Sequence, residues 1–187
     1  ARLEGADLRK TNLRNIWLRA ANLDGDDITG VQFGELPFLQ QDSQVDCSAI
    51  SPDGEIYAVG LWSGDIILYE TSNWDRIQSW KGHSQNIKYL AFSATGDQIA
   101  SRGNDAILRL WDIKTGDCVH TLPSVSFNVD CAAYSPNGER VASACEDRAV
   151  RLWDTKNGEC IHTLYHKSFV DCVSFSPNGN RLASSMN

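Results

Sequence analysis

Apolar and polar positions recur with a period of 42 residues (51 to 93 to 135) through most of the chain. In each repeat a strand-like run ends in a tight turn that starts with Ser and finishes with Gly. Gly, Asn and Asp supply the positive φ angles that such turns need. Further short apolar runs follow each turn, so the pattern predicts about four strands per repeat. The turns occupy residues 51–54, 93–96, 135–138 and 176–179, after runs at 45–51, 87–93, 129–135 and 170–176.

The start of the chain has a different repeat, of five residues. Leucine recurs at positions 3, 8, 13, 18 and 23, and Ile28, Phe33 and Phe38 continue the register. A period of five fits neither a helix nor a strand. The pattern resembles the pentapeptide-repeat family, which implies a right-handed quadrilateral β-helix over residues 1–38 with four units per turn. Alternatively, residues 33–38 form the outer strand of a closing sheet of the longer repeat, and the sequence leaves both readings open.

Two further motifs connect the 42-residue repeat with a known family. The third strands end in Leu110-Trp111-Asp112 and Leu152-Trp153-Asp154, and Gly82-His83 opens a unit, whereas Tyr69-Glu70 replaces Trp-Asp in the first unit. The chain therefore resembles the WD-repeat family, which implies an all-β, incomplete propeller over residues 39–187. The expected blades cover about 42–81, 82–122 and 123–164, with a half blade at 165–187. Propellers have about four to eight blades, so we expect the chain to be a segment of a longer protein.

In that family a His, a Ser, an Asp and a Trp form a buried hydrogen-bond network. The resemblance assigns this structural tetrad to His83, Ser101, Asp105 and Trp111 in the second blade. The same repeat positions hold Ser143, Asp147, Trp153 and His166, whereas the third blade has Val125 in place of His and the first has Val59, Ser63 and Tyr69. These departures predict that the second blade is the most rigid and that the first lacks the network.

His83, Ser101 and Asp105 are also the residue types of a hydrolase triad. All three occupy repeat positions, and no Gly-x-Ser-x-Gly motif surrounds Ser101. The structural role is therefore the favoured interpretation. Burial separates the two, because a catalytic serine must reach a pocket and a tetrad serine is enclosed.

The family binds partners at loops and strand ends around its channel, and the repeat spacing carries those positions over to this chain. The candidate partner-binding face comprises Gln44, Asp46, Trp62, Asn86, Lys88, Asn104, Asn128, Asp130, Glu146, Phe169 and Asp171. Exposed Trp and Phe beside charged residues are typical of interface hot spots. The recurring aspartates predict an acidic rim for a basic ligand, or local caps of backbone N–H groups.

Charge and cysteine spacing narrow the possible partners. A net charge of −7 disfavours nucleic acid as a ligand, and no apolar run is long enough to span a membrane. The six cysteines follow the repeat, so we expect reduced cytoplasmic thiols at positions too far apart to form disulfides. No C-x-x-C pair or nucleotide-binding loop is present, so no metal or other cofactor is expected.

These features favour a non-catalytic scaffold or ligand-sensing module that binds other proteins or peptides. Pentapeptide units followed by WD repeats also look like the C-terminal region of NACHT-type signalling NTPases, where the repeats act as a sensor arm. That alternative depends on domain order alone. The hydrolase built on His83, Ser101 and Asp105 is the least favoured of the three.

Overall fold

The computed structural model describes residues 12–13, 32–33, 41–123, 129–145 and 147–186. The chain divides into two units, Ala1–Gln40 and Gln41–Asn187. In the first unit, strands β1 (Asn12–Leu13) and β2 (Gln32–Phe33) pair in parallel, with Asn12 opposite Gln32 and Leu13 opposite Phe33. Each pair lies 20 residues apart, which is the offset of four five-residue units. The β-helix over residues 1–38 remains a prediction, because most of it, including Phe38, lies outside the described residues.

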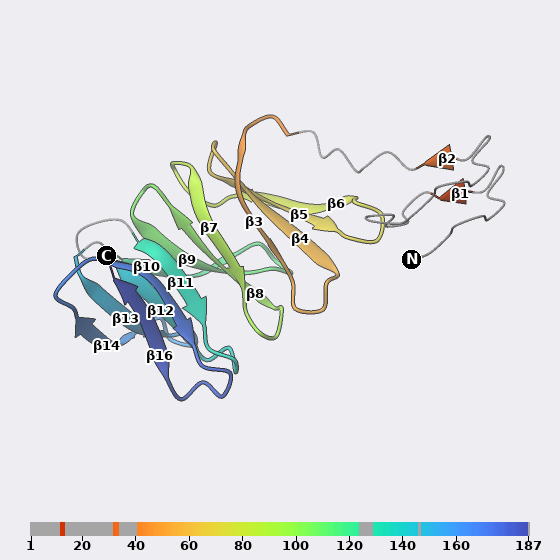
Figure 1. The fold of residues 1–187 in the computed structure, drawn as a ribbon. Coiled ribbons are helices and arrows are strands. Elements are labelled where there is room, and N and C mark those ends of the chain that lie inside the picture. The colour runs from red at the N-terminus through yellow and green to blue at the C-terminus, as the bar shows by residue number, and fades with distance from the viewer. Residues whose placement is uncertain (1–11, 14–31, 34–40, 124–128, 146, 187) are drawn as a thin grey trace, which may run out of the picture. The chain divides into compact units, whose positions relative to one another are not determined.

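The second unit contains three antiparallel sheets of four strands and one of two strands, which confirms the prediction of an all-β fold (Figure 1). The strands of each sheet pair in chain order. The first sheet contains β3 (Val45–Ile50), β4 (Ile56–Leu61), β5 (Asp65–Glu70) and β6 (Arg76–Lys81), and the second β7 (Ile87–Phe92), β8 (Gln98–Gly103), β9 (Ile107–Asp112) and β10 (Cys118–Pro123). The third contains β11 (Val129–Tyr134), β12 (Arg140–Cys145), β13 (Ala149–Asp154) and β14 (Cys160–Tyr165), and the last β15 (Val170–Phe175) and β16 (Leu182–Met186). We call these sheets blades 1 to 4.

The recurring serine explains the turn between the first two strands of each blade. In blade 2, the Ser93 hydroxyl accepts the backbone N–H of Gln98 at 3.0 Å, while Gly96, at φ +75°, donates its own N–H to the Ser93 carbonyl at 3.0 Å. Equivalent hydroxyl bonds form at Ser51, Ser135 and Ser176. The side chain thus satisfies a backbone donor that the turn would otherwise leave unpaired.

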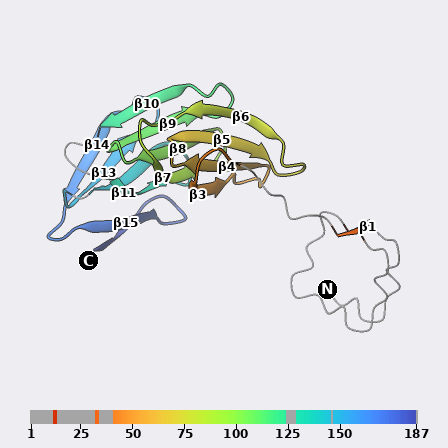
Figure 2. The ribbon, with the colours of Figure 1, turned by 90° about the horizontal axis from the view of Figure 1, so that it is seen from above.

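The hydrophobic cores lie between blades. Ile66 and Leu68 of blade 1 pack with Ile87, Ile99 and Trp111 of blade 2 in one cluster. A second cluster joins blades 2 and 3, and a third joins blades 3 and 4. Neighbouring blades therefore bury each other's faces, and the first strands β3, β7, β11 and β15 lie next to one another (Figure 2). Within the described ranges, no helix is long and apolar enough to cross a membrane.

Candidate functional site

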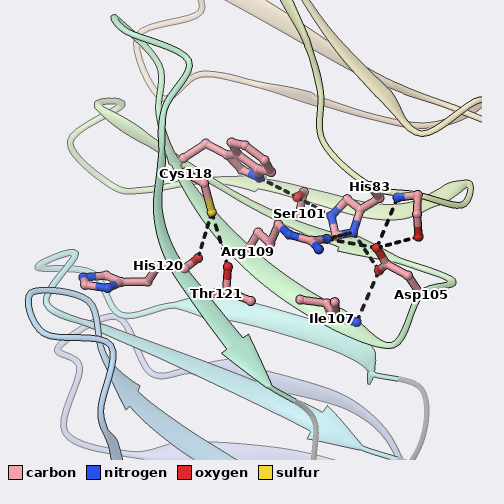
Figure 3. Close-up of polar contacts among 10 residues, drawn as sticks. His83, Ser101, Asp105, Ile107, Arg109, Cys118, His120 and Thr121 are labelled. Atoms are coloured by element: carbon pink, nitrogen blue, oxygen red, sulfur yellow. Dashed lines mark hydrogen bonds and ion pairs between the residues drawn. The ribbon is translucent and has the colours of Figure 1, made fainter.

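The four side chains assigned to the tetrad in blade 2 form one continuous chain of hydrogen bonds (Figure 3). Trp111 Nε1 donates to Ser101 Oγ at 2.7 Å, and Ser101 Oγ lies 2.7 Å from His83 Nε2. His83 Nδ1 lies 2.8 Å from Asp105 Oδ1. Because Ser101 accepts the indole proton, its own proton can be donated to Nε2, and a proton on Nδ1 can then be donated to Asp105. Arg109 Nη1 also lies 2.6 Å from Nδ1.

Burial and local hydrogen bonds set the charge states in this chain. Burial lowers the pKa of His83, since the surroundings penalise the imidazolium, and the Asp105 carboxylate opposes this only in part. Burial raises the pKa of Asp105, but hydrogen bonds from His83 and Arg109 lower it more, and the net pKa lies below its ordinary value. A neutral histidine therefore faces an ionised aspartate.

The surroundings of Ser101 do not suit a nucleophile. Ser101 is 0% exposed and His83 is 2% exposed, and Ser101 Oγ is already bonded to His83 and Trp111. The backbone of Gly103 also packs directly against the imidazole, since a Cβ on Gly103 would lie 2.4 Å from His83 Nδ1. A substrate has no route to this hydroxyl, so the geometry supports the structural role over the hydrolase alternative.

Two arginines that the sequence analysis missed complete the networks. Arg109 donates to Asp105 Oδ2 at 3.0 Å. In blade 3, Arg151 is 4% exposed and donates to both oxygens of Asp147, while Trp153 donates to Ser143 at 2.9 Å. Arg151 thus binds Asp147 as Arg109 binds Asp105. Val125 lies outside the described residues. Both arginines stand four residues after the tetrad aspartate, and this recurrence is the signal that could have identified them.

Blade 1 has different contacts at the positions equivalent to the tetrad. Gln41 stands 42 residues before His83, and its amide donates to the Tyr69 hydroxyl, which occupies the position of Trp111. Ser63 donates to Asp65 at 2.6 Å. These two contacts involve other residue types and do not form the four-residue chain of blade 2, because Val59 stands at the position of Ser101. For His166 the structure shows a backbone bond, from its N–H to the Arg148 carbonyl at 2.7 Å.

Five residues of the predicted partner-binding face form one cluster at the start of β3 and β7. Asp46 Oδ2 accepts from Asn86 Nδ2 at 2.8 Å and from Lys88 Nζ at 3.0 Å, and Gln44 Nε2 lies 3.4 Å from Asp46 Oδ1. The Lys88 ammonium lies 5.2 Å from the centre of the Trp62 ring. These contacts link blade 1 to blade 2, and we call Gln44, Asp46, Trp62, Asn86 and Lys88 the Asp46 cluster.

The contacts within this cluster change the roles predicted for Asp46 and Asn86. The Asp46 side chain is 8% exposed, and hydrogen bonds from Asn86 and Lys88 lower its pKa. Asn86 is 6% exposed. The Asp46 carboxylate is therefore bound by Asn86 and Lys88 and does not belong to an open acidic rim, and Asn86 is a buried donor to this carboxylate. Trp62, by contrast, is 56% exposed.

A second aromatic–cation pair lies between blades 3 and 4. The Arg148 guanidinium lies 5.5 Å from the centre of the Phe169 ring, which is 53% exposed. Asp171 and Asn104 are exposed as well. Asn128, Glu146 and the Asp130 side chain lie outside what the structure describes. In the described ranges, no group of three His, Cys, Asp or Glu residues could hold a metal ion.

The prediction that equivalent cysteines lie too far apart to bridge is wrong for one pair. Cys131 of β11 and Cys172 of β15 have their Sγ atoms 3.1 Å apart. The error arises because the 42-residue period fixes the position of a residue within its blade but not the lateral distance between blades. The first strands of neighbouring blades (β3, β7, β11 and β15), which we call the innermost strands, pack side by side and bring equivalent side chains together.

Comparison with known proteins agrees with this geometry. Residues 116–154 and 158–187 match the family model of the WD domain, G-beta repeat, and residues 49–131 match that of the anaphase-promoting complex subunit 4 WD40 domain. Apoptotic protease-activating factor 1 of Mus musculus is 31% identical over 99 residues, which is 50% of this chain and 8% of that protein. Pre-mRNA-processing factor 19 of Schizosaccharomyces pombe is 28% identical over 76 residues, 40% of this chain and 16% of that protein.

The fold and the networks define a class of protein built from antiparallel four-stranded blades that pack face to face. The family matches identify these units more closely: the chain contains WD40 repeats. Repeats of this kind generally act as non-catalytic modules that bind other proteins. The chain spans 8% and 16% of the length of the two relatives described above.

Proposed function

We propose that this chain is a non-catalytic protein-recognition module of a larger multidomain protein. It binds its partner with the face at the start of the innermost strands, where Trp62 and Phe169 are exposed. The WD40 repeats support a role in protein binding, and the enclosure of Ser101 argues against hydrolysis. The partner is a protein or peptide segment with an apolar side chain that packs on these rings.

The observation that carries this proposal is the ordered presentation of Trp62. More than half of this side chain is exposed, yet the Lys88 ammonium lies over its ring and is itself held by Asp46. A large aromatic side chain that is fixed before binding loses little conformational entropy when a partner covers it. Tryptophan is also among the residue types most enriched in interface hot spots.

Site-specific photo-cross-linking tests this face. A photoreactive phenylalanine analogue replaces Trp62 in the full chain, and the matched control carries it at Ile77 of β6, which is 52% exposed on the outer strand. In extracts of the native source, we expect a discrete protein adduct from position 62 and none from position 77. Equal adducts from both positions, or adducts from position 77 alone, would contradict the proposal.

As a second candidate, we propose that the module is the sensor arm of an NTPase located upstream in the same chain, in the cytoplasm. Its support is the order of the two repeats, together with the 20-residue offset between β1 and β2 that suits a pentapeptide coil. In the full-length protein, partner binding would then change the rate of nucleotide hydrolysis. A full-length sequence without any NTPase motif would rule this out and leave the recognition module standing.

A further inference from the structure

Two thiols meet between the innermost strands of blades 3 and 4. Cys131 Sγ lies 3.1 Å from Cys172 Sγ, and both sulfurs lie 3.7 Å from the carbonyl oxygen of Val173. A disulfide needs its sulfurs about 2.05 Å apart, so an approach of about 1 Å by side-chain rotation would join them. Cys172 is exposed and Cys131 is half-buried.

The repeat explains why this pair forms where it does. The third residue of β3, β7 and β11 contacts the following blade: in the first two, Cys47 Sγ lies 3.5 Å from the Ile87 carbonyl, and the Tyr89 hydroxyl donates to the Ala132 carbonyl. Cys131 makes the equivalent contact with the Val173 carbonyl. Cysteines stand at consecutive equivalent positions in blades 3 and 4, whereas Tyr89 follows Cys47.

We propose that Cys131 and Cys172 form a redox site that takes a low-molecular-weight disulfide, such as glutathione disulfide, as its oxidant. The accessible Cys172 thiolate attacks one sulfur of the oxidant, which forms a mixed disulfide and releases one glutathione thiol. The Cys131 thiol then loses its proton and attacks the Cys172 sulfur, which displaces the second glutathione thiol. The two protein thiols lose two electrons and two protons in total, and the oxidant is reduced to two thiols.

Cys118, Cys160 and Cys47 have different surroundings from the Cys131–Cys172 pair and should give different oxidation products. Cys118 and Cys160 are exposed, but their sulfurs contact groups of their own strands, such as the carbonyls of His120 and His162 at 3.4 Å. They have no second thiol in contact, so their reaction stops at the mixed disulfide. Burial raises the pKa of Cys47 to about 12, which keeps this thiol protonated and unreactive.

The Cys131–Cys172 bond would tie β15 and β16 to blade 3. Val170 and Val173 of β15 pack with Ala142, Ala144 and Val150 of blade 3, so the bond would reinforce an interface that already exists. Oxidation should therefore slow hydrogen exchange of the β15 and β16 amides, and a reducing agent should restore the original rate. The state of this site would set how firmly blade 4 is held.

Peptide mapping of the full chain tests the proposal. The reduced protein is treated with glutathione disulfide, the remaining thiols are alkylated, and tryptic peptides are analysed without reduction. We expect peptide 115–140 to be joined to peptide 168–181 with the loss of two hydrogens. Because peptide 115–140 contains both Cys118 and Cys131, fragmentation of the cross-linked peptide should place the bond to Cys172 at Cys131 and the glutathione at Cys118. Cys118 and Cys160 should carry glutathione. The C47S variant should give the same cross-link, and C172S should give none.

Two results would overturn the proposal. One is recovery of Cys131 and Cys172 as separate alkylated peptides from a sample in which Cys118 and Cys160 are glutathionylated. The other is a cross-linked wild-type chain whose β15 and β16 amides exchange as fast as those of the reduced chain. Circular dichroism on each variant establishes that it is folded, and the wild-type mapping stands whatever the variants do.

Discussion

At the scale of single residues, this protein uses polar side chains that resemble a catalytic triad to hold a blade together. Ser101 accepts from Trp111 and contacts His83, and His83 contacts Asp105. Each of these four side chains thus has a polar partner, which is the condition for burying it at low cost.

The first prediction concerns Asp105. Replacing it with Ala leaves His83 Nδ1 without its acceptor and Arg109 without its carboxylate, so we expect a loss of about 1–3 kcal/mol in the free energy of unfolding. Urea denaturation measures the loss, with Asp117→Ala at an exposed turn as the matched control. If D105A and D117A unfolded at the same urea concentration, the tetrad would not contribute to stability.

The second prediction concerns pH. Because burial lowers the pKa of His83, the unfolded chain binds a proton at this residue more readily than the folded chain does. Stability from His83 is therefore complete above the unfolded pKa, about 6.5, and decreases as the pH falls toward the lower folded value. Between about pH 7.5 and pH 5.5, we expect wild type and H162Q to lose more unfolding free energy than H83Q does.

Glutamine suits this comparison because Gln41 already occupies the equivalent position in blade 1. His162 lies on the exposed outer strand β14 and controls for the loss of a histidine as such. Parallel pH profiles for wild type and H83Q would show that His83 does not carry the dependence.

At the scale of elements, the 42-residue period predicted the first strand of each blade to within one residue, because Ser and Gly mark the turn that follows this strand in every blade. It failed where a contact depends on the neighbouring blade. Asp46 looked like an acidic rim residue, but Lys88 of the next blade neutralises it. The Cys131–Cys172 contact was missed for the same reason. A repeat fixes the alignment of residues within blades, whereas lateral contacts depend on packing.

The turn between the second and third strands gives the third prediction. Ala106 lies in this turn with a φ of 61°, directly before β9 begins at Ile107. Glycine fills the equivalent turn position in blade 1, where Gly64 has a φ of 91°. Since Ala is strained in this region, we expect Ala106→Gly to stabilise the protein by up to about 1 kcal/mol.

Thermal unfolding measures this effect. Arg148 has the equivalent strain, with a φ of 64°, but it also lies over Phe169, so Arg148→Gly should gain less than Ala106→Gly. A106G with a lower melting temperature than wild type would contradict the strain argument.

At the scale of the whole molecule, the cores between blades couple each blade to the next. Ile99 of blade 2 is 0% exposed and packs in one cluster with Ala58, Ile66 and Leu68 of blade 1. We expect Ile99→Ala to destabilise the protein by about 2–4 kcal/mol and to speed hydrogen exchange in β4 and β5 more than in β12 and β13. V119A, on the exposed outer strand, is the control, and equal acceleration in blades 1 and 3 would contradict this coupling.

We propose that the packed blades present Trp62 and Phe169 on one face. The affinity for the cross-linked partner tests that claim most directly. Isothermal titration of the full chain would compare wild type with W62A and with I77A, which removes a similarly exposed apolar side chain from the outer strand. Loss of a hot-spot tryptophan costs about 2 kcal/mol or more, so we expect W62A to weaken binding at least about 30-fold and I77A to leave it within about twofold. Equal affinities for wild type and W62A would contradict the account.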